Sequence, residues 1–246
     1  MANPQFKWGI DLARSFQWPI SGRILDAGCG SGRLTAELLK FFPGGKVVAV
    51  DTDASMVDKA RRSLSAEIVK GKVEIHRSDL LRFKLRQPVD LIYSNAVFHW
   101  ILDHAALWER CHGWLNPGAW LHAEFGGHGN LQPQLDLVER LGEHEDYRDA
   151  IGKVTRPVRY ANAQETASGL KASGFTDVEV SLEARPTFFG ESEAFEAFAR
   201  TVVLRPYRMA LGPGLWDSFV NDWLRIQLEE RGKYLDYVRL RVSARA

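Results

Sequence analysis

The feature that most constrains the fold is the stretch ILDAGCGSGRL, residues 24–34. Gly28, Gly30 and Gly32 follow an apolar run and precede a helical pattern. Glycine weakens regular elements and is favoured where the backbone takes positive φ or approaches another group closely. The stretch therefore predicts a short buried strand, a tight turn and the start of a helix. Backbone N–H groups at such a helix start are available to a ligand.

Apolar segments alternate with helical patterns from residue 23 to residue 184. Continuous apolar strands separated by helices predict a parallel sheet that is covered on both faces. The predicted strands are residues 23–28, 46–51, 72–79, 89–98, 119–125 and 177–184. The predicted helices among them are residues 32–42, 54–68, 104–115 and 163–173, and another helix is expected before the first strand, over residues 3–18.

The C-terminal part departs from this alternation. Residues 191–203 and 214–230 each have apolar side chains at helical spacing, and residues 237–244 alternate as a last strand. The predicted fold class is α/β: a doubly wound, mostly parallel seven-stranded sheet with a helical insertion before the last strand. We expect an N-terminal helical lid (1–22), an α/β core (23–188), a helical insertion that caps the active site (189–236) and a last core strand (237–246).

Asp51 closes the second predicted strand, 23 positions after Gly28. An acidic residue at this place can bind the two hydroxyls of a ribose, so the ligand is expected to contain a nucleoside. Arg33 stands where the dinucleotide fingerprint has its third glycine, and Asp26 at the strand end is a poor neighbour for a pyrophosphate. A ligand with a positive amine or sulfonium fits better. A nicotinamide-dependent oxidoreductase and a plain turn with an acidic cap remain alternatives.

Composition and charge narrow the class of protein. The formal net charge is +1, which gives no strong field for nucleic acid or an anionic membrane. Cys29 and Cys111 are too few for a disulfide framework or a structural zinc site, and together with the absence of a signal-like N-terminus they favour a cytoplasmic protein. Five histidines fall between residues 99 and 128 without a metal-binding pattern, so no metal is expected.

Four motifs in order, LDAGCGSGR, VVAVDTD, HRSDLLRF and DLIYSNAVFHWI, resemble the class I S-adenosylmethionine-dependent methyltransferases. The resemblance implies the Rossmann-like fold of that class and S-adenosylmethionine as cofactor, with S-adenosylhomocysteine as product. It also implies that the cofactor-binding residues are Asp26, Gly28, Cys29, Gly30, Asp51, Thr52, Met56, Ser78, Asp79, Leu80, Asn95 and Ala96. Asp79 as a helix cap and Met56 as a core residue are the structural alternatives.

Within this class the chain is most similar to the trans-aconitate 2-methyltransferases, through residues 94–121, the "VLRPY" segment and the last strand. His99-Trp100 stands where those enzymes usually have Gln-Trp, and the "EFGGHGN" segment is unlike theirs. The resemblance implies a small-molecule acceptor, no nucleic acid or membrane partner, and a monomer or weak homodimer. The substrate-binding candidates are Trp8, His99, Trp100, Arg205, Tyr207 and Tyr237, and His99 is the catalytic candidate.

The expected reaction is O-methylation of a carboxylate such as trans-aconitate. A carboxylic acid is already ionised at neutral pH, so this reaction needs no general base. If the acceptor is instead a phenol, an alcohol or a carbon acid, His99 is the expected base. Arg208 and Arg239 are further candidates for holding an acid, although Arg239 and Arg241 alternate with apolar neighbours and could form the solvent face of the last strand. A non-catalytic cofactor-binding protein is the remaining alternative.

Overall fold

The structure is a computed structural model that describes residues 4–154 and 158–246. The chain divides into two units. The larger unit comprises the described residues up to 128 with 159–183 and 239–246, and the smaller unit comprises 129–158 and 184–238. This division differs from the expected boundaries at residues 129–158, which were expected to belong to the core.

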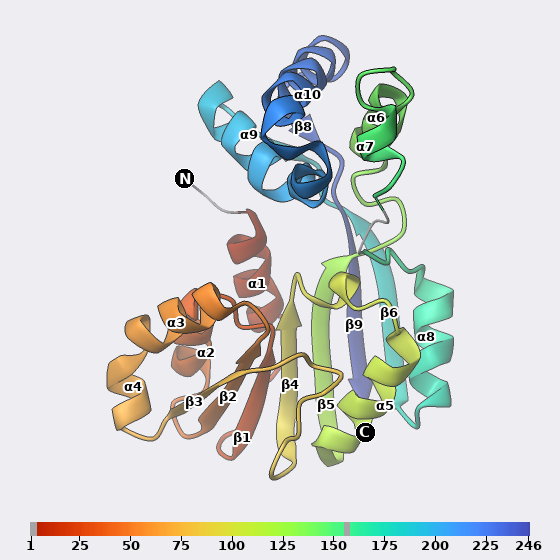
Figure 1. Cartoon of the computed structure of the whole chain (residues 1–246). Helices are drawn as coiled ribbons and strands as arrows, with labels where there is room; N and C mark the ends of the chain where they lie inside the picture. Colours follow the sequence, from red (N-terminus) through yellow and green to blue (C-terminus); the bar gives the residue numbers. More distant parts are fainter. Residues whose placement is uncertain (1–3, 155–157) are drawn as a thin grey trace. The chain divides into compact units, whose positions relative to one another are not determined.

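The larger unit is built on one seven-stranded sheet (Figure 1). Its strands are β1 (Arg23–Ala27), β2 (Lys46–Asp51), β3 (Val73–Arg77), β4 (Val89–Asn95), β5 (Leu115–Gly126), β6 (Thr176–Ala184) and β9 (Val238–Arg245). Their order is β3-β2-β1-β4-β5-β9-β6. The pairs from β3 to β5 are parallel, and β9 runs antiparallel to β5. The predicted mostly parallel, seven-stranded sheet is confirmed, and its strand order reverses between β1 and β4.

Helices cover both faces of this sheet because its strands are apolar on both sides. On one face, α5 (His104–Trp114) and α8 (Ala163–Ala172) pack with Leu25 and Val48. The opposite face carries α1 (Pro4–Arg14), α2 (Arg33–Phe41), α3 (Ala54–Ser63) and α4 (Ser65–Val69), where Ile24 and Val47 pack with Phe42 and Leu64. A short 3-10 helix, η1 (Phe98–Trp100), follows β4. The sheet therefore leaves its strand ends, rather than its faces, available to ligands.

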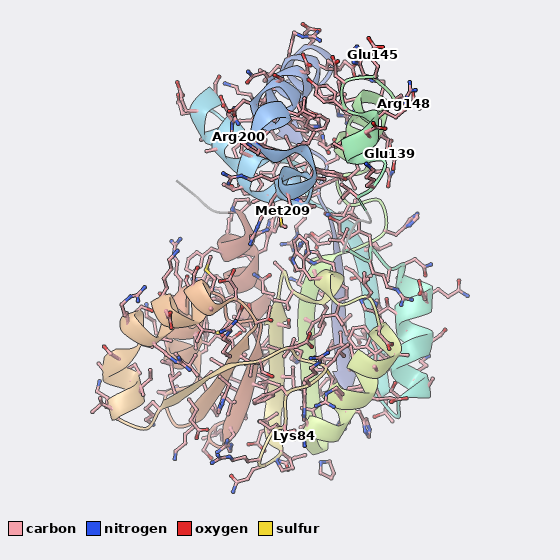
Figure 2. The ribbon with its side chains drawn as sticks, in the orientation of Figure 1. Lys84, Glu139, Glu145, Arg148, Arg200 and Met209 are labelled. Carbon is pink, nitrogen blue, oxygen red and sulfur yellow. The ribbon has the colours of Figure 1, made fainter. Side chains whose placement is uncertain are left out.

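The smaller unit is mainly helical. It contains α6 (Gln132–Gly142), α7 (Arg148–Ile151), α9 (Ser192–Phe198), the π-helical turn η2 (Ala199–Val203), η3 (Arg205–Tyr207) and α10 (Arg208–Glu230), with a two-stranded ribbon of β7 (Thr187–Phe188) and β8 (Tyr234–Leu235). The two predicted C-terminal helices are present, and α10 is kinked at Gly212, where φ is 61°. Arg200, labelled in Figure 2, pairs with Glu196 and Asp217 within this unit.

A buried polar network fixes the smaller unit internally. Gln134 Nε2 donates a hydrogen bond to Asp236 Oδ2 at 3.0 Å, and Trp223 Nε1 donates to the Gln134 carbonyl at 3.2 Å. These contacts join α6 to α10 and to the segment after β8, which explains why residues 129–158 group with the insertion. Across residues 4–154 and 158–246, no helix is both long and apolar enough to cross a lipid bilayer.

Candidate active site

The three glycines of the turn after β1 share a positive φ, but Gly28 and Gly30 differ in their surroundings. All three have positive φ: 89° at Gly28, 53° at Gly30 and 77° at Gly32. A Cβ atom at Gly28 would lie 2.1 Å from a Val97 methyl group, whereas a Cβ atom at Gly30 would have no atom within 4 Å. Packing against η1 therefore requires Gly28, and Gly30 borders open space. A ligand can approach the backbone at Gly30.

Asp26 is a buried carboxyl group at the end of β1. It is 2% exposed, and its Oδ2 accepts a hydrogen bond from Thr35 Oγ1 of α2 at 2.6 Å. Burial raises the pKa of Asp26 to about 7, and the nearby charge of Asp51 adds to this shift. A positively charged ligand group beside Asp26 would favour its ionised form. Thr35 was missed in the sequence because nothing in the local pattern links it to Asp26.

Asp51 organises the glycine turn directly. Its Oδ2 accepts from the Gly30 N–H at 2.8 Å, and its Oδ1 accepts from the Asp53 N–H at 2.9 Å. Asp53 in turn caps the start of α3. Each carboxylate oxygen has a second lone pair, so Asp51 can still accept hydrogen bonds from a pair of hydroxyl groups. One side chain thus connects the loops after β1 and β2.

The neighbouring residues of these loops differ in exposure. Cys29 is buried, and burial raises the pKa of its thiol, so it is a neutral packing group rather than a reactive one. Thr52 is exposed, and Met56 is half-buried in the first turn of α3. Met56 is therefore not a fully buried core residue.

The loop after β3 lies next to the loop after β2. The Ser78 N–H donates to the Asp51 carbonyl at 3.0 Å. Asp79 Oδ1 accepts from the Leu81 N–H at 2.7 Å, so Asp79 closes a turn; no helix begins there, and it is not the helix cap of its structural alternative. Leu80 is buried beside it. The structure brings the predicted residues from β1, β2 and β3 together along one edge of the sheet.

The end of β4 continues this edge. Asn95 Nδ2 donates to the Gln5 carbonyl of α1 at 2.9 Å, and among the described residues Asn95 Oδ1 is buried without a hydrogen-bond partner. Ala96 has a φ of 61°, and its N–H donates to the Glu124 carbonyl at 2.7 Å. A positive φ at a non-glycine residue is strained and persists only where the surroundings impose it. The chain is therefore held in an unfavourable conformation beside the glycine turn.

Helix α1 is fastened to the same strand end. Tyr93 Oη donates to the Gly9 carbonyl at 2.7 Å, and a Cβ atom at Gly9 would lie 2.6 Å from Leu34 and 2.9 Å from Asn95 Nδ2. Glycine at this position lets the helix backbone approach β4 and α2. The sequence pattern predicted the helix but not this close approach.

His99 lies on η1, two residues after Val97, which packs against Gly28 of the glycine turn. It is 7% exposed, and its Nδ1 accepts a hydrogen bond from the backbone N–H of Gly126 at 3.3 Å. Burial lowers the pKa of His99 to about 3, with smaller contributions from Arg239 and His104. Its ring contacts those of Trp100, which is 46% exposed, and Tyr160.

Other histidines of this region have packing partners. His104 lies 3.1 Å from the Phe98 carbonyl through Nε2, and His122 stacks on Phe16 with ring centroids 4.0 Å apart. Burial lowers the pKa of His122 to about 4. Within residues 4–154 and 158–246, no three His, Cys, Asp or Glu side chains are grouped as a metal site.

Arg239 contradicts the expectation of a solvent face on the last strand. It is 1% exposed, its Nε lies 3.4 Å from Glu124 Oε1, and its guanidinium lies 4.9 Å from the centre of the Trp8 ring. Arg241, on the same strand, reaches Glu124 Oε2 at 3.2 Å and is partly exposed. Glu124 is fully buried on β5, and both arginines lie on the face of the sheet that carries its side chain. The solvent-face interpretation was wrong for Arg239 because the alternating pattern does not reveal a buried carboxylate on the neighbouring strand.

The six substrate candidates divide between the two units. Trp8, His99 and Trp100 belong to the larger unit, and Trp8 is buried over Arg239. Arg205, Tyr207 and Tyr237 belong to the smaller unit, where the two tyrosines are 3% exposed and Arg205 is exposed. Arg208 of the same unit lies over the Trp216 ring at 5.7 Å.

Comparison with known proteins agrees with this geometry. Residues 25–121 match a methyltransferase domain family. Over 204 residues the chain is 29% identical to a trans-aconitate 2-methyltransferase from Methylobacterium radiotolerans, and the match covers 82% of this chain and 75% of that protein.

Two solved structures share the fold. A putative methyltransferase from Bacillus halodurans has a TM-score of 0.62 at 15% identity, with 99% of both chains covered. The phosphoethanolamine N-methyltransferase 2 of Haemonchus contortus, in complex with phosphomonomethylethanolamine and S-adenosylhomocysteine, has a TM-score of 0.61 at 19% identity. This match covers 98% of our chain, which spans about half (52%) of the Haemonchus protein. Domain, relatives and fold agree: this protein, with its methyltransferase domain over residues 25–121, is an S-adenosylmethionine-dependent methyltransferase, and S-adenosylmethionine is its cofactor.

Proposed function

We propose that this enzyme transfers a methyl group from S-adenosylmethionine to a carboxylate oxygen of a small organic acid, and that trans-aconitate is the first acceptor to test. The similarity to trans-aconitate 2-methyltransferases supports an acid of this kind. The structural observation that carries the proposal is the placement of two cations, Arg239 and Arg241, around the one buried acid Glu124, at the end of the sheet that also bears the glycine turn. A fixed cation at this edge favours an anionic acceptor.

The residues along the first part of this edge fit the cofactor. Asp26 is a buried acid with a raised pKa, which suits the positively charged amino group of the methionine part. Asp51 keeps lone pairs for the ribose hydroxyls, and the open space at Gly30 admits the ligand to the backbone. We assign Thr52, Met56, Ser78, Asp79 and Leu80 to the adenine end. Cys29 belongs to the loop that holds the methionine part, and Asn95 and Ala96 to the loop that faces the sulfonium and the acceptor.

The bound cofactor supplies an electrophilic methyl group on its sulfonium. The chain's own task is to position the acceptor oxygen in line with the S–CH3 bond and to exclude water, which contributes roughly 7–11 kcal/mol in well-oriented systems. Trp8, Trp100, Arg205, Tyr207 and Tyr237 stay our candidates for holding the rest of the acceptor. The helices at 1–22 and 189–236 stay our candidates for a lid and a cap.

A methyl-transfer assay tests this function. The purified protein is incubated with S-adenosylmethionine and one acceptor at a time: trans-aconitate, cis-aconitate, citrate, a monocarboxylic acid, a phenol and an alcohol. We expect a methyl ester, which mass spectrometry detects as an added CH2 and which mild alkali removes. Methylation of only the phenol or the alcohol would overturn the carboxylate proposal, while binding of S-adenosylhomocysteine by calorimetry checks that the protein is active as a cofactor binder.

A further inference from the structure

We infer that His99 is a hydrogen-bond donor with a fixed tautomer, which holds the acceptor oxygen through Nε2–H and does not act as a general base. This inference rests on the proposed function for the identity of the acceptor. It adds a role for His99: because His99 takes no proton from the acceptor, the reacting oxygen must already be anionic. The geometry of a single backbone hydrogen bond carries it.

The tautomer follows from the partner of Nδ1. A backbone N–H can only donate, so the Gly126 N–H, 3.3 Å from Nδ1, requires a lone pair on that nitrogen. In a neutral imidazole the proton must then be on Nε2. Among the described residues this is the one side-chain hydrogen bond of His99, so Nε2–H remains available to a ligand.

The surroundings keep the ring neutral. Two ionisable side chains act on the ring, Arg239 of β9 and His104 of α5, and neither carries a negative charge. The rings of Trp100 and Tyr160 also lie against it. Burial and the charge of Arg239 both oppose a second proton, which lowers the pKa of His99 to about 3. Between pH 5 and pH 9 the charge of His99 therefore does not change.

This state decides which acceptors can react. A carboxylate oxygen uses a lone pair to form the O–CH3 bond while the electrons of the C–S bond pass to sulfur, so no proton has to leave. A hydroxyl acceptor must lose a proton, but Nε2 already carries one and the Nδ1 lone pair is engaged with Gly126. His99 thus supplies no base for a hydroxyl acceptor and binds a carboxylate through its N–H.

Nitrogen NMR on the protein labelled with 15N-histidine tests the tautomer without any acceptor. His99→Asn identifies the signals of His99 by their loss. We expect Nδ1 unprotonated and Nε2 protonated from pH 5 to pH 9, and a shift of the Nε2 signal when trans-aconitate is added with S-adenosylhomocysteine. A proton on Nδ1, or a titration near pH 6.5, would overturn the inference.

Two variants separate the nitrogens. Asparagine at 99 places an oxygen near Nδ1 to accept from Gly126 but cannot donate at the Nε2 position, whereas glutamine places an amide N–H there. His99→Asn should lower kcat/KM for the carboxylate roughly 10- to 150-fold, the worth of a hydrogen bond to a charged group, and His99→Gln should recover most of this loss. His144→Asn is the matched control, because the exposed His144 also accepts a backbone N–H, from Asp146, through Nδ1.

The pH profile and the folding control complete the test. With S-adenosylmethionine at saturating concentration at every pH, wild-type kcat/KM for the carboxylate should not follow a group that titrates near pH 6.5. A fall below that pH that disappears in both variants would identify a base instead. His99→Gln leaves the Gly126 N–H without this partner, so binding of S-adenosylhomocysteine serves as the check that the variant is folded. If the variant is unfolded, the NMR measurement on the wild-type protein decides the inference. If no carboxylate reacts while Nε2 is protonated, the proposed function fails and the assigned tautomer stands.

Discussion

The two halves of the sheet's ligand edge carry opposite charge. The cofactor half consists of the loops after β1, β2 and β3, which are residues 26–32, 51–56 and 78–80. All charged side chains of these loops are aspartates: Asp26, Asp51, Asp53 and Asp79. The acceptor half, residues 95–100, 124–126 and 239–241, has Arg239 and Arg241 around the single buried acid Glu124. The cationic cofactor and the anionic acceptor that we propose are each complementary in charge to one of these halves.

The largest expected effect concerns the buried pair of the acceptor half. Arg239→Met leaves Glu124 with one fewer cation, and breaking a buried pair typically lowers the free energy of unfolding by about 3–5 kcal/mol. Arg245→Met is the matched control, since Arg245 lies on the same strand but is exposed and should cost about 1 kcal/mol or less. Urea denaturation measures both. Equal, small losses would show that the buried pair does not stabilise the acceptor half.

The cofactor half should respond in binding instead of stability. Asp26→Asn removes the negative charge that we assign to binding of the methionine amino group. It should weaken S-adenosylhomocysteine binding roughly 10- to 150-fold, measured by calorimetry. At pH 8 the free variant should melt at a higher temperature than the wild type, because a carboxylate with a pKa of about 7 is ionised and buried there.

Asp58→Asn on the exposed face of α3 is the control for the Asp26 variant. It should change neither the binding of S-adenosylhomocysteine nor the melting temperature. Unchanged binding in Asp26→Asn would break the charge comparison, because the buried acid would then not contact the cationic part of the cofactor.

Gly9→Ala tests the close packing of α1 against the end of β4 and against α2. A Cβ atom at Gly9 would crowd Leu34 and Asn95, and overpacking of this kind costs typically about 1–3 kcal/mol. Gly113→Ala, in a helix with no atom within 4 Å of the new Cβ, should instead stabilise by roughly 0.5–1 kcal/mol. Thermal melts compare the pair. A Gly9→Ala protein as stable as Gly113→Ala would mean that α1 does not need its close approach.

The smallest effect is a difference in pH response between the halves. Below pH 7 the carboxyl of Asp26 must lose a proton when a cation binds, so S-adenosylhomocysteine affinity should fall by up to tenfold, about 1.4 kcal/mol, for each pH unit. The sign follows because the bound cation lowers the pKa of Asp26. Calorimetry in two buffers of different ionisation enthalpy counts the proton. Constant affinity from pH 6 to pH 8 would show that Asp26 is already ionised in the free protein.

The two halves also differ in how much the sequence revealed. The fold and the cofactor half follow local signals: the glycine turn, the aspartates at strand ends, and strands that alternate with helices. The spacing of Asp51 after the glycine turn predicted that the two act together, and in the folded chain the Gly30 N–H donates to Asp51.

The acceptor half depends on contacts between distant parts of the chain. The Gly126–His99 bond spans 27 positions, and the Arg239–Glu124 contact spans 115. Neither contact has a local pattern, so the burial of Arg239 and the hydrogen bond from Gly126 to His99 appeared only in the folded chain. The same reason applies to Thr35 beside Asp26 and to the grouping of residues 129–158 with the insertion, which the packing of α6 against α10 determines.

The contact of Val97 with Gly28 limits how this enzyme can evolve. A methyl group at 28 would displace Val97, and with it the short helix that carries residues 99 and 100. Substitutions at 99 and 100 leave this contact in place, so the side chains of the short helix can change while Val97 and Gly28 stay matched. The turn that we assign to the methyl donor then keeps its shape.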